Sequence, residues 1–461
     1  MPSERSRIFN VVACSALLTL SLPLMWGQTS NFQGSVAAGP VSATVLVLPL
    51  DDAIDRGLRN NLGLLLSTLQ TDSARGQRLE QLQPLLPRID GNIQEAALQT
   101  DLAAQGLRIP HFPSVIGPYG YTDLRANLSW SLIDLSALRK YLAARHNFNA
   151  AQLSAQDARE MVILAVGNAY LLVLADEAHV QSVDAELATA MNSLDQAVAN
   201  HQAGTAPLLD ELRARVDSQS EEQQLIAARN ALEKDKLALA RTIGLPLAQR
   251  FVLSDKVPFA AMDGIDLDAA LKTAHANRRD LAALEEQTVA GEQQHKAAVD
   301  DRLPTLKVTA DYGDIGVNVS HSHGTGNAVG TLGIPIFNEA QFRGESLVTQ
   351  SQLDTLRAQL SDKSAQVDAD VRVAVLDITA AEQLVQVAHS NADLAREVLS
   401  EAQQRYAIGV SDNLAVTQAL GSVAQANNQY VTSLYRHNMA KLNLARALGE
   451  IHSYKTYLGG K

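Results

Sequence analysis

The stretch Leu237-Ala-Leu-Ala-Arg-Thr-Ile-Gly244 returns near the end of the chain as Leu442-Asn-Leu-Ala-Arg-Ala-Leu-Gly449. The two copies lie 205 residues apart (449 minus 244), and this spacing holds without a gap from 194–244 onto 399–449. Matches continue upstream, where Val166 stands opposite Val371. Because chance similarity does not easily hold one register over so many residues, we interpret the chain as an internal duplication.

The beginnings of the two copies follow a longer spacing. Asn60 stands opposite Asn277 and Pro87 opposite Pro304, an offset of 217 residues (304 minus 87). The first copy therefore carries 12 more residues (217 minus 205), and we place this surplus within 101–122, whose prolines and glycines predict a loop. The resulting division is a flexible N-terminal segment at 28–47, a first repeat at 48–244, a linker at 245–266, a second repeat at 267–449 and a tail at 450–461.

The composition is that of a chain rich in long helices. Of its 461 residues, 46% are hydrophobic but only 4% are aromatic. Ala, Leu, Val and Gln predominate instead of Phe, Tyr and Trp, as is typical of long helices and coiled coils. The formal net charge is −12, which argues against a nucleic-acid partner, because phosphate backbones favour basic surfaces.

The N-terminus has the pattern of a secretory signal. Arg5 and Arg7 precede an apolar run at 8–26, which predicts a signal peptide at 1–27, with an uncleaved membrane anchor as the alternative. Cys14, the only cysteine, lies in this segment, so the mature chain has no thiol chemistry, and lipidation of Cys14 stays open. No later segment reaches the roughly 20 apolar residues of a spanning helix, so we expect any membrane crossing to use strands.

Two long helical hairpins are predicted at about 135–243 and 339–449. No proline follows Pro335, and proline costs about 3 kcal/mol inside a helix. Steps of four and three between apolar positions predict a coiled-coil seam, although ordinary amphipathic helices share this spacing. The seam residues are Val367, Val371, Ala374, Ile378, Ala381, Val385 and Ala388 in one helix and Val416, Leu420, Val423, Asn427, Tyr430 and Leu434 in the next.

Two glycines interrupt the helical runs at equivalent places. Gly204 and Gly409 are each followed by a short step of small or polar residues before the helix resumes. A glycine after a helix commonly takes the left-handed conformation that ends it. We therefore expect both to mark hairpin tips at the same end of the molecule.

Four strands are predicted before the long helices, at about 88–99, 123–134, 305–320 and 328–338. Apolar and polar residues alternate in them, as in the strands of a membrane barrel, and a half-buried soluble sheet is the alternative. We expect a water-filled lumen to be faced by Arg125, Asn127, Ser129, Lys307, Thr309 and Asp311. We expect lipid to be faced by Leu124, Leu128, Trp130, Leu332 and Ile334.

The strand number sets a constraint on assembly. Barrels of about eight strands are already filled by side chains, so four strands cannot enclose water. Open strand edges are not tolerated in lipid. If these strands span a membrane, several chains must contribute to one barrel.

Together these features resemble the TolC-like outer-membrane efflux family, over nearly all of the mature chain. In the first copy the matching residues are Asn60, Leu86-Pro87, Leu128-Ser-Trp-Ser-Leu-Ile-Asp134, Gly204 and Leu239-Ala-Arg-Thr-Ile-Gly-Leu-Pro246. In the second copy they are Asn277, Leu303-Pro304, Leu332-Gly-Ile-Pro-Ile-Phe-Asn338, Tyr406-Ala-Ile-Gly-Val-Ser411 and Leu444-Ala-Arg-Ala-Leu-Gly449. Each match alone is weak, but their order and duplication are specific.

The resemblance implies a mainly α protein with a β-barrel segment: a homotrimer with a twelve-stranded barrel in outer-membrane lipid and a periplasmic α-helical coiled-coil tunnel. The segments 245–266 and 450–461 would form an equatorial band. It implies a passive exit duct of a tripartite efflux or type I secretion system, docked on a periplasmic adaptor and through it on an inner-membrane pump. The resemblance carries the docking role to Gly204, Thr205, Gly409, Val410 and Ser411.

The resemblance also implies a gate at the periplasmic end, often acidic. Here Asp412 is available, with Asp210 in the first copy, but Ala415 and Gln418 stand where further carboxylates would be expected. The sequence thus departs from the family pattern at this point, which leaves a solvated tip residue as the alternative role for Asp412.

No motif indicates catalysis. The chain has no GxxxxGK[ST] phosphate loop, HExxH motif or paired-cysteine metal site, so we expect neither enzymatic activity nor a cofactor or metal. His321 and His323 are two apart and would share a strand face, but we interpret them as part of a surface loop. The competing hypothesis for function is a soluble periplasmic coiled-coil adaptor or scaffold.

Overall fold

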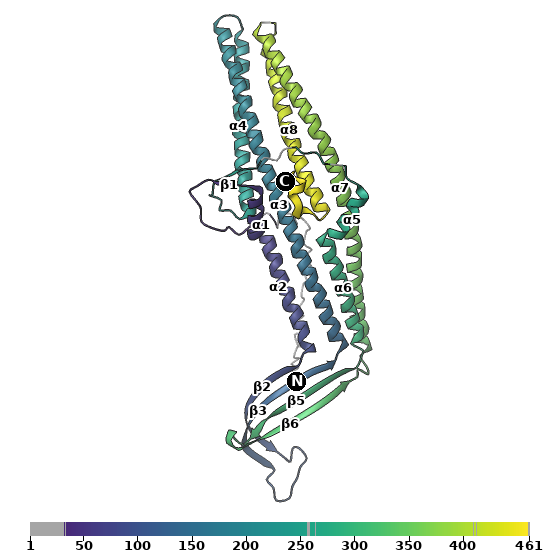
Figure 1. Cartoon of the computed structure of the whole chain (residues 1–461). Coiled ribbons are helices and arrows are strands. Elements are labelled where there is room, and N and C mark those ends of the chain that lie inside the picture. The colour runs from purple at the N-terminus through teal and green to yellow at the C-terminus, as the bar shows by residue number, and fades with distance from the viewer. Residues whose placement is uncertain are drawn as a thin grey trace, which may run out of the picture.

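The computed structural model describes residues 32, 34–255, 259–262, 264–408, 410–411 and 413–459. The predicted signal peptide with Cys14 lies outside the described residues, as do Gly409 and Asp412. The chain is elongated, with a sheet at one end and the turns of two helical hairpins at the other (Figure 1).

The long helices are those that the sequence predicts. The first hairpin consists of α3 (Leu135–Gln202) and α4 (Leu208–Ile243), and the second of α7 (Glu339–Ala407) and α8 (Asn413–Ala447). At 1.5 Å per residue, the 68 residues of α3 extend over about 100 Å. This helix begins where the Asp134 carboxylate accepts a hydrogen bond of 2.8 Å from the Ala137 amide.

Each long hairpin is preceded by a pair of shorter helices. These are α1 (Leu50–Asn60) and α2 (Leu62–Leu82) in the first repeat, and α5 (Leu267–Asn277) and α6 (Arg279–Asp300) in the second. Helix α2 packs on α3 and α6 packs on α7, while α3 also packs on α6 and joins the two repeats. The two repeats therefore share the same arrangement, in which a shorter helix packs on the first long helix of the hairpin.

The repeated glycine explains the repeated motif. Gly244 and Gly449 have φ angles of +74° and +72°, which favour glycine. A Cβ atom at Gly244 would lie 2.5 Å from the Cβ of Asn60, and one at Gly449 would lie 2.8 Å from the carbonyl carbon of Asn277. Asn60 and Asn277 are themselves equivalent positions, so both repeats end in the same close contact.

The coiled-coil seam of α7 is confirmed, whereas that of α8 is rotated. All seven seam residues predicted in α7 are buried. In α8 the buried stripe runs through Val416, Ala419, Val423 and Ala426, and the predicted Leu420 is only half-buried. The reason is that α8 packs on both α7 and α3, and the small alanines allow the closest approach.

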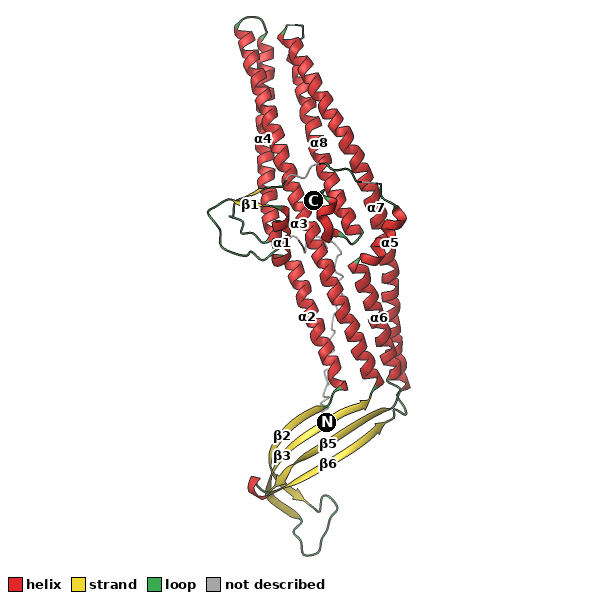
Figure 2. Ribbon diagram, viewed as in Figure 1, coloured by secondary structure: helices red, strands yellow, loops and turns green. Residues whose placement is uncertain are grey.

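The four strands form one antiparallel sheet in the order β2-β3-β5-β6, so β2 and β6 are its edges (Figure 2). Their bounds are Arg88–Asp101 for β2, Val115–Ile133 for β3, Thr305–Gly316 for β5 and Ser322–Gly333 for β6. The 12-residue surplus of the first repeat thus appears partly as the loop 102–114 and partly as an earlier start of β3.

Strand β6 begins and ends earlier than predicted. Ile334 follows its last residue, because Pro335 has no backbone N–H for a strand ladder. His323 pairs with Ile315 within the sheet, and His321 ends the 3₁₀ turn η3 (Val319–His321), so the interpretation of both histidines as one loop was wrong for His323. Tyr312 lies over Gly324 and Gly326, which explains why a glycine-rich segment pairs there.

A band of irregular structure surrounds the bundle at mid-height (Figure 1). Strands β1 (Leu46–Leu48) and β4 (Phe251–Leu253) pair in parallel, and the tail contributes η4 (Ile451–Ser453) and α9 (Tyr454–Tyr457). The N-terminal segment expected to be flexible is hydrogen-bonded here, since Val36 donates to the Asn60 carbonyl at 2.9 Å. The main core cluster lies at this level.

One helix is more apolar than the sequence analysis allowed. Helix α3 contains an 18-residue window with a mean hydropathy of 1.6, long and apolar enough to cross a membrane, which corrects the expectation that no segment qualified. This helix supplies Val162, Val166 and Tyr170 to the mid-height core, where all three are fully buried. Burial inside the bundle accounts for the apolar composition.

The Tyr170 hydroxyl provides a test of this core. It donates hydrogen bonds to the Leu48 carbonyl at 3.0 Å and to Asp255 Oδ2 at 3.2 Å. Tyr170→Phe leaves these buried acceptors with fewer donors, so we expect a loss of about 1 to 2 kcal/mol, measured by thermal unfolding in detergent. Tyr119→Phe, at a side chain that is 43% exposed, should leave the melting temperature unchanged, and an equal loss there would contradict this account.

Candidate functional site

One face of the sheet is polar, and the strand register brings the predicted lumen residues together on it. Asn127 lies opposite Asp311, and Ser129 opposite Thr309. Lys307 pairs with Ser131, and Arg125 continues the same face. Residues two apart on one strand share a face, so all six predicted residues form one continuous polar surface.

Arg125 is the centre of this polar face. Its guanidinium forms ion pairs with Asp311 on β5 and with Asp123 on its own strand, the latter at 3.3 Å. It also donates a hydrogen bond of 3.0 Å to the Thr325 hydroxyl on β6. One side chain therefore connects three adjacent strands and forms ion pairs with two carboxylates.

The opposite face of the sheet is apolar. Leu124, Leu128 and Trp130 share it on β3, and Leu332 joins it on β6. The Trp130 indole donates to the Leu85 carbonyl at 3.1 Å, which fixes an amphipathic ring at the end of the sheet that adjoins the helices. Ile334, predicted on this face, is 57% exposed but lies beyond the strand.

The hairpin tips are the second candidate surface. Gly204 has a φ of +74° and open space around it, and both the amide and the hydroxyl of Thr205 donate to the Asn200 carbonyl at 2.9 Å. In the second tip the Val410 amide donates to the Arg405 carbonyl at 3.0 Å, and Ser411 is half-buried. The tips lie at the same end of the molecule, as predicted (Figure 1).

Apolar side chains at the tips were not singled out from the sequence. The exposed ones are Leu208, Leu209, Leu212, Ile408, Val410 and Leu414. The sequence did contain a sign of this apolar surface, because two leucines directly follow Pro207 at a turn that is expected to face water. An apolar surface at the end of an extended bundle is suited to binding another protein.

The two hairpins are connected near their tips. The Thr417 hydroxyl donates to Asp217 Oδ2 at 2.6 Å, which links α8 to α4. Asp210, predicted as a gate residue, is only 7% exposed, and its carboxylate lies 3.8 Å from Arg213. It is therefore not a freely solvated carboxylate in this arrangement.

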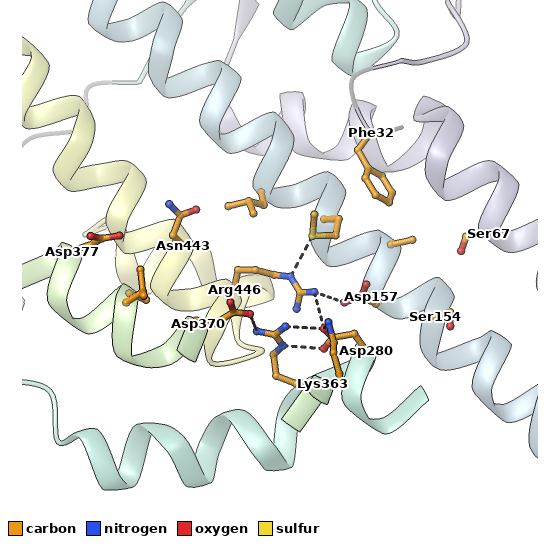
Figure 3. A pocket seen from close by; sticks show the side chains of 17 residues that line it. Phe32, Ser67, Ser154, Asp157, Asp280, Lys363, Asp370, Asp377, Asn443 and Arg446 are labelled. Atoms are coloured by element: carbon orange, nitrogen blue, oxygen red, sulfur yellow. Dashed lines mark hydrogen bonds and ion pairs between the residues drawn. The ribbon is translucent and has the colours of Figure 1, made fainter. Parts of the chain in front are cut away.

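A cluster of charged residues lies where the two repeats meet, around a cavity of about 700 Å³ (Figure 3). Arg446, from the repeated motif, forms ion pairs with Asp157 and Glu160 of α3. Arg278 lies 2.7 Å from Asp280 and 3.0 Å from Asp370. The remaining cation of the cluster is Lys363, 2.7 Å from Asp280.

The pKa values of two carboxyl groups in this cluster are shifted in opposite directions. Burial raises the pKa of Glu160 to about 7, although Arg446 offsets part of the effect. Burial also disfavours the charge of Asp280, but hydrogen bonds from Arg278 and Lys363 hold its pKa well below its usual range. No group of three metal-ligating side chains occurs among the described residues. The ion pairs of this cluster join α3, α6, α7 and α8.

Replacing Arg446 should expose how much the cluster depends on it. Arg446→Met leaves Asp157 and Glu160 with no cation in contact, and an uncompensated buried charge costs about 3 to 5 kcal/mol. We expect a clear drop in the melting temperature. Arg396→Met removes an exposed ion pair with Asp393 and should cost less than about 1 kcal/mol. Similar losses in both variants would contradict the assignment.

A second acidic contact gives a pH dependence. Burial and a hydrogen bond with Asp235 raise the pKa of Asp176 to about 7. Because the folded pKa exceeds the unfolded value of about 4, the stabilisation is present at low pH and is lost as the pH rises through 7. Asp176→Asn should therefore raise the melting temperature more near pH 8 than near pH 5. Asp184→Asn, at an exposed ion pair with Arg229, should show no such difference. An effect of Asp176→Asn that does not change with pH would contradict the raised pKa of Asp176.

The comparisons with known proteins come from sequence and from structure. The family model described as outer membrane efflux protein matches residues 53–245 and 270–450. The probable efflux pump outer membrane protein SepC of Pseudomonas putida is 24% identical over 424 residues, which cover 86% of this chain and 82% of SepC. The pyoverdine export outer membrane protein OpmQ of Pseudomonas putida is 22% identical and covers 89% of this chain and 86% of its own.

Solved channels share the fold. The CmeC outer membrane channel of Campylobacter jejuni superposes with a TM-score of 0.77 at 18% identity and covers 93% of this chain and 95% of its own. The outer membrane protein VceC of Vibrio cholerae gives a TM-score of 0.75 at 19% identity, covering 87% and 96%. Since the family model spans both repeats, the chain belongs to the outer membrane efflux protein family, as an outer-membrane channel component and not an enzyme.

Proposed function

We propose that three copies of this chain close a twelve-stranded barrel in the outer membrane and continue it as a helical tunnel through the periplasm. The supporting observation is the sheet itself, which has four strands, two open edges and one polar face. Three sheets joined edge to edge leave no unpaired strand and place Arg125 and its neighbours around a water-filled lumen.

The helices support the same assembly. Leu171 of α3 is 3% exposed and Ala283 of α6 is 4% exposed, at the contact between the two repeats. Their equivalents in the other repeat, Leu376 and Leu66, are 69% and 50% exposed. The second repeat of one copy would cover the first repeat of the next copy with these residues, and the ring closes after three copies.

The hairpin tips would be the docking surface for a periplasmic adaptor, and through it for an inner-membrane pump. Gly204, Thr205, Gly409, Val410 and Ser411 would form the turns, and the exposed tip leucines would supply apolar contact area. The duct itself would be passive, with energy from the pump. The names of the relatives refer to efflux pumps and export, which favours a tripartite efflux system over type I secretion.

The periplasmic end would also carry the gate. Asp412 would line it as a ring of three carboxylates that repel one another. Asp210 is buried, so it would hold the closed arrangement of the tips and not line the passage. The segment 1–27 would direct the chain across the inner membrane.

The direct test is single-channel conductance of the purified full chain in planar bilayers. We expect a stable trimer with one conducting pathway. A pure trimer with no conductance, or a chain that remains soluble after cell fractionation without detergent, would favour the soluble periplasmic scaffold instead.

Two neighbouring residues on opposite faces of β3 provide a matched prediction. Leu128→Arg places a charge on the proposed lipid face, which costs about 2 to 4 kcal/mol at the middle of a bilayer, so we expect less trimer in the outer membrane. Asn127→Arg places the same charge in the proposed lumen, so we expect normal assembly and altered conductance. The reverse outcome would show that the two faces have been exchanged.

A further inference from the structure

The internal duplication can be used to identify which side chains would meet at a contact between two copies of the chain. Inside one chain, α8 of the second repeat packs on α3 of the first. By the repeat offset of 205, the equivalent contact would place α4 of one copy on α7 of its neighbour. No such contact exists within a single chain among the principal helix pairs that the structure describes.

The side chain that anchors the internal contact is Arg446, which lies against Asp157. Subtracting and adding the offset of 205 gives Arg241 as the equivalent of Arg446, and Asp362 as the equivalent of Asp157. Both residue types are conserved between the repeats of this chain. The cation ends the helical part of each repeat, and the carboxylate lies at the same height on each long helix.

Arg241 and Asp362 differ from their equivalents in one respect. The side chains of Arg446 and Asp157 are 11% and 23% exposed, whereas Arg241 and Asp362 are both exposed to solvent. Within the part of the chain that the structure describes, neither the Arg241 nor the Asp362 side chain takes part in a hydrogen bond or ion pair. Arg241 and Asp362 are therefore oppositely charged, exposed side chains on the two helices that would form the equivalent contact between copies.

We infer that Arg241 of one copy pairs with Asp362 of the next, so that each contact between copies repeats the Arg446 contact inside the chain. This inference rests on the proposed ring of three copies. Gln366 of α7 corresponds to Met161, whose sulfur accepts from Arg446 Nε at 3.4 Å, so its amide oxygen would be a second acceptor for Arg241.

The contact between copies would be simpler than the internal cluster. Asp280 and Lys363, which complete the internal network, correspond to Gly63 and Ala158. The Arg241 pair is therefore left without the competing charges that surround Arg446. We expect it to orient neighbouring copies at mid-height, where the ring must be in register from barrel to tips.

Cross-linking of the full chain in detergent tests this assignment. Arg241→Cys and Asp362→Cys are combined in one variant, and a short bis-maleimide is used because an arginine–aspartate pair separates the Cβ atoms by more than a disulfide accepts. We expect a ladder of cross-linked dimer and closed trimer on denaturing gels. Each single variant, with one introduced thiol in each mature copy, should give only monomer.

The matched control combines Arg241→Cys with Arg357→Cys. Arg357 lies on the same helix as Asp362, about 140° around its axis, and donates to Glu292 of its own chain at 3.0 Å. It should give no ladder. A sample that is trimeric by native mass spectrometry but cross-links no better through position 362 than through 357 would overturn the inference and leave the proposed function intact. A sample that is monomeric would overturn both.

Charge exchange provides a second measurement. Arg241→Glu and Asp362→Arg should each lower the temperature at which the trimer band is lost on denaturing gels, because each places like charges opposite one another. The double variant should recover most of that shift. Additive losses in the double variant would show that the two residues do not meet.

Discussion

Backbone amides and carbonyls at the edge of a sheet need hydrogen-bond partners, and a lipid bilayer offers none. In this chain the edges are β2 and β6, and one face of the sheet between them is apolar while the other is polar. A sheet of this kind is incomplete by itself. In the proposed ring, the rest of the structure would bring the β6 edge of one copy beside the β2 edge of the next in the right register. The long helices, their exposed apolar faces and the mid-height band would all help to hold neighbouring copies parallel in this ring.

Duplication is an economical way to build such a ring. The internal contact between α3 and α6 and the proposed contact between copies would use equivalent surfaces, so the same packing would occur at six places around the axis of the ring. The two versions are not the same in composition. The internal contact has a buried ion-pair network around Arg446, which is formed once and need not come apart. The surfaces that would face another copy instead carry a larger apolar side chain, Leu66, where the internal contact has the buried Ala283. Such residues contribute free energy of association without requiring several charges to be desolvated together.

Much of this architecture could be predicted from the sequence, because repeats, helix periodicity and strand alternation are local patterns. The seam of α7 and the shared polar face of β3 and β5 follow directly from spacing. The rotation of the α8 seam could not be predicted, since Leu420 and Ala419 are both apolar and only the position of α3 decides between them. The early end of β6 had a signal in Pro335, but the alternation of Leu332 and Ile334 pointed the other way. The burial of Asp210 depends on contacts at the tips between segments far apart in sequence, and no local pattern encodes such contacts.

The loop 102–114 exists only in the first repeat, and it lies at the end of the sheet farthest from the helices (Figure 1). Without it, two similar repeats in each of three copies would approach sixfold symmetry all along the axis. With it, the outer rim of the proposed ring is strictly threefold, and three loops alternate with three short turns around η3. Leu107, Ile109 and Phe112 are exposed on this loop. An antibody or other external blocker raised against the rim would therefore meet three identical epitopes and three gaps, and its footprint would report on the symmetry of the assembly from outside the cell.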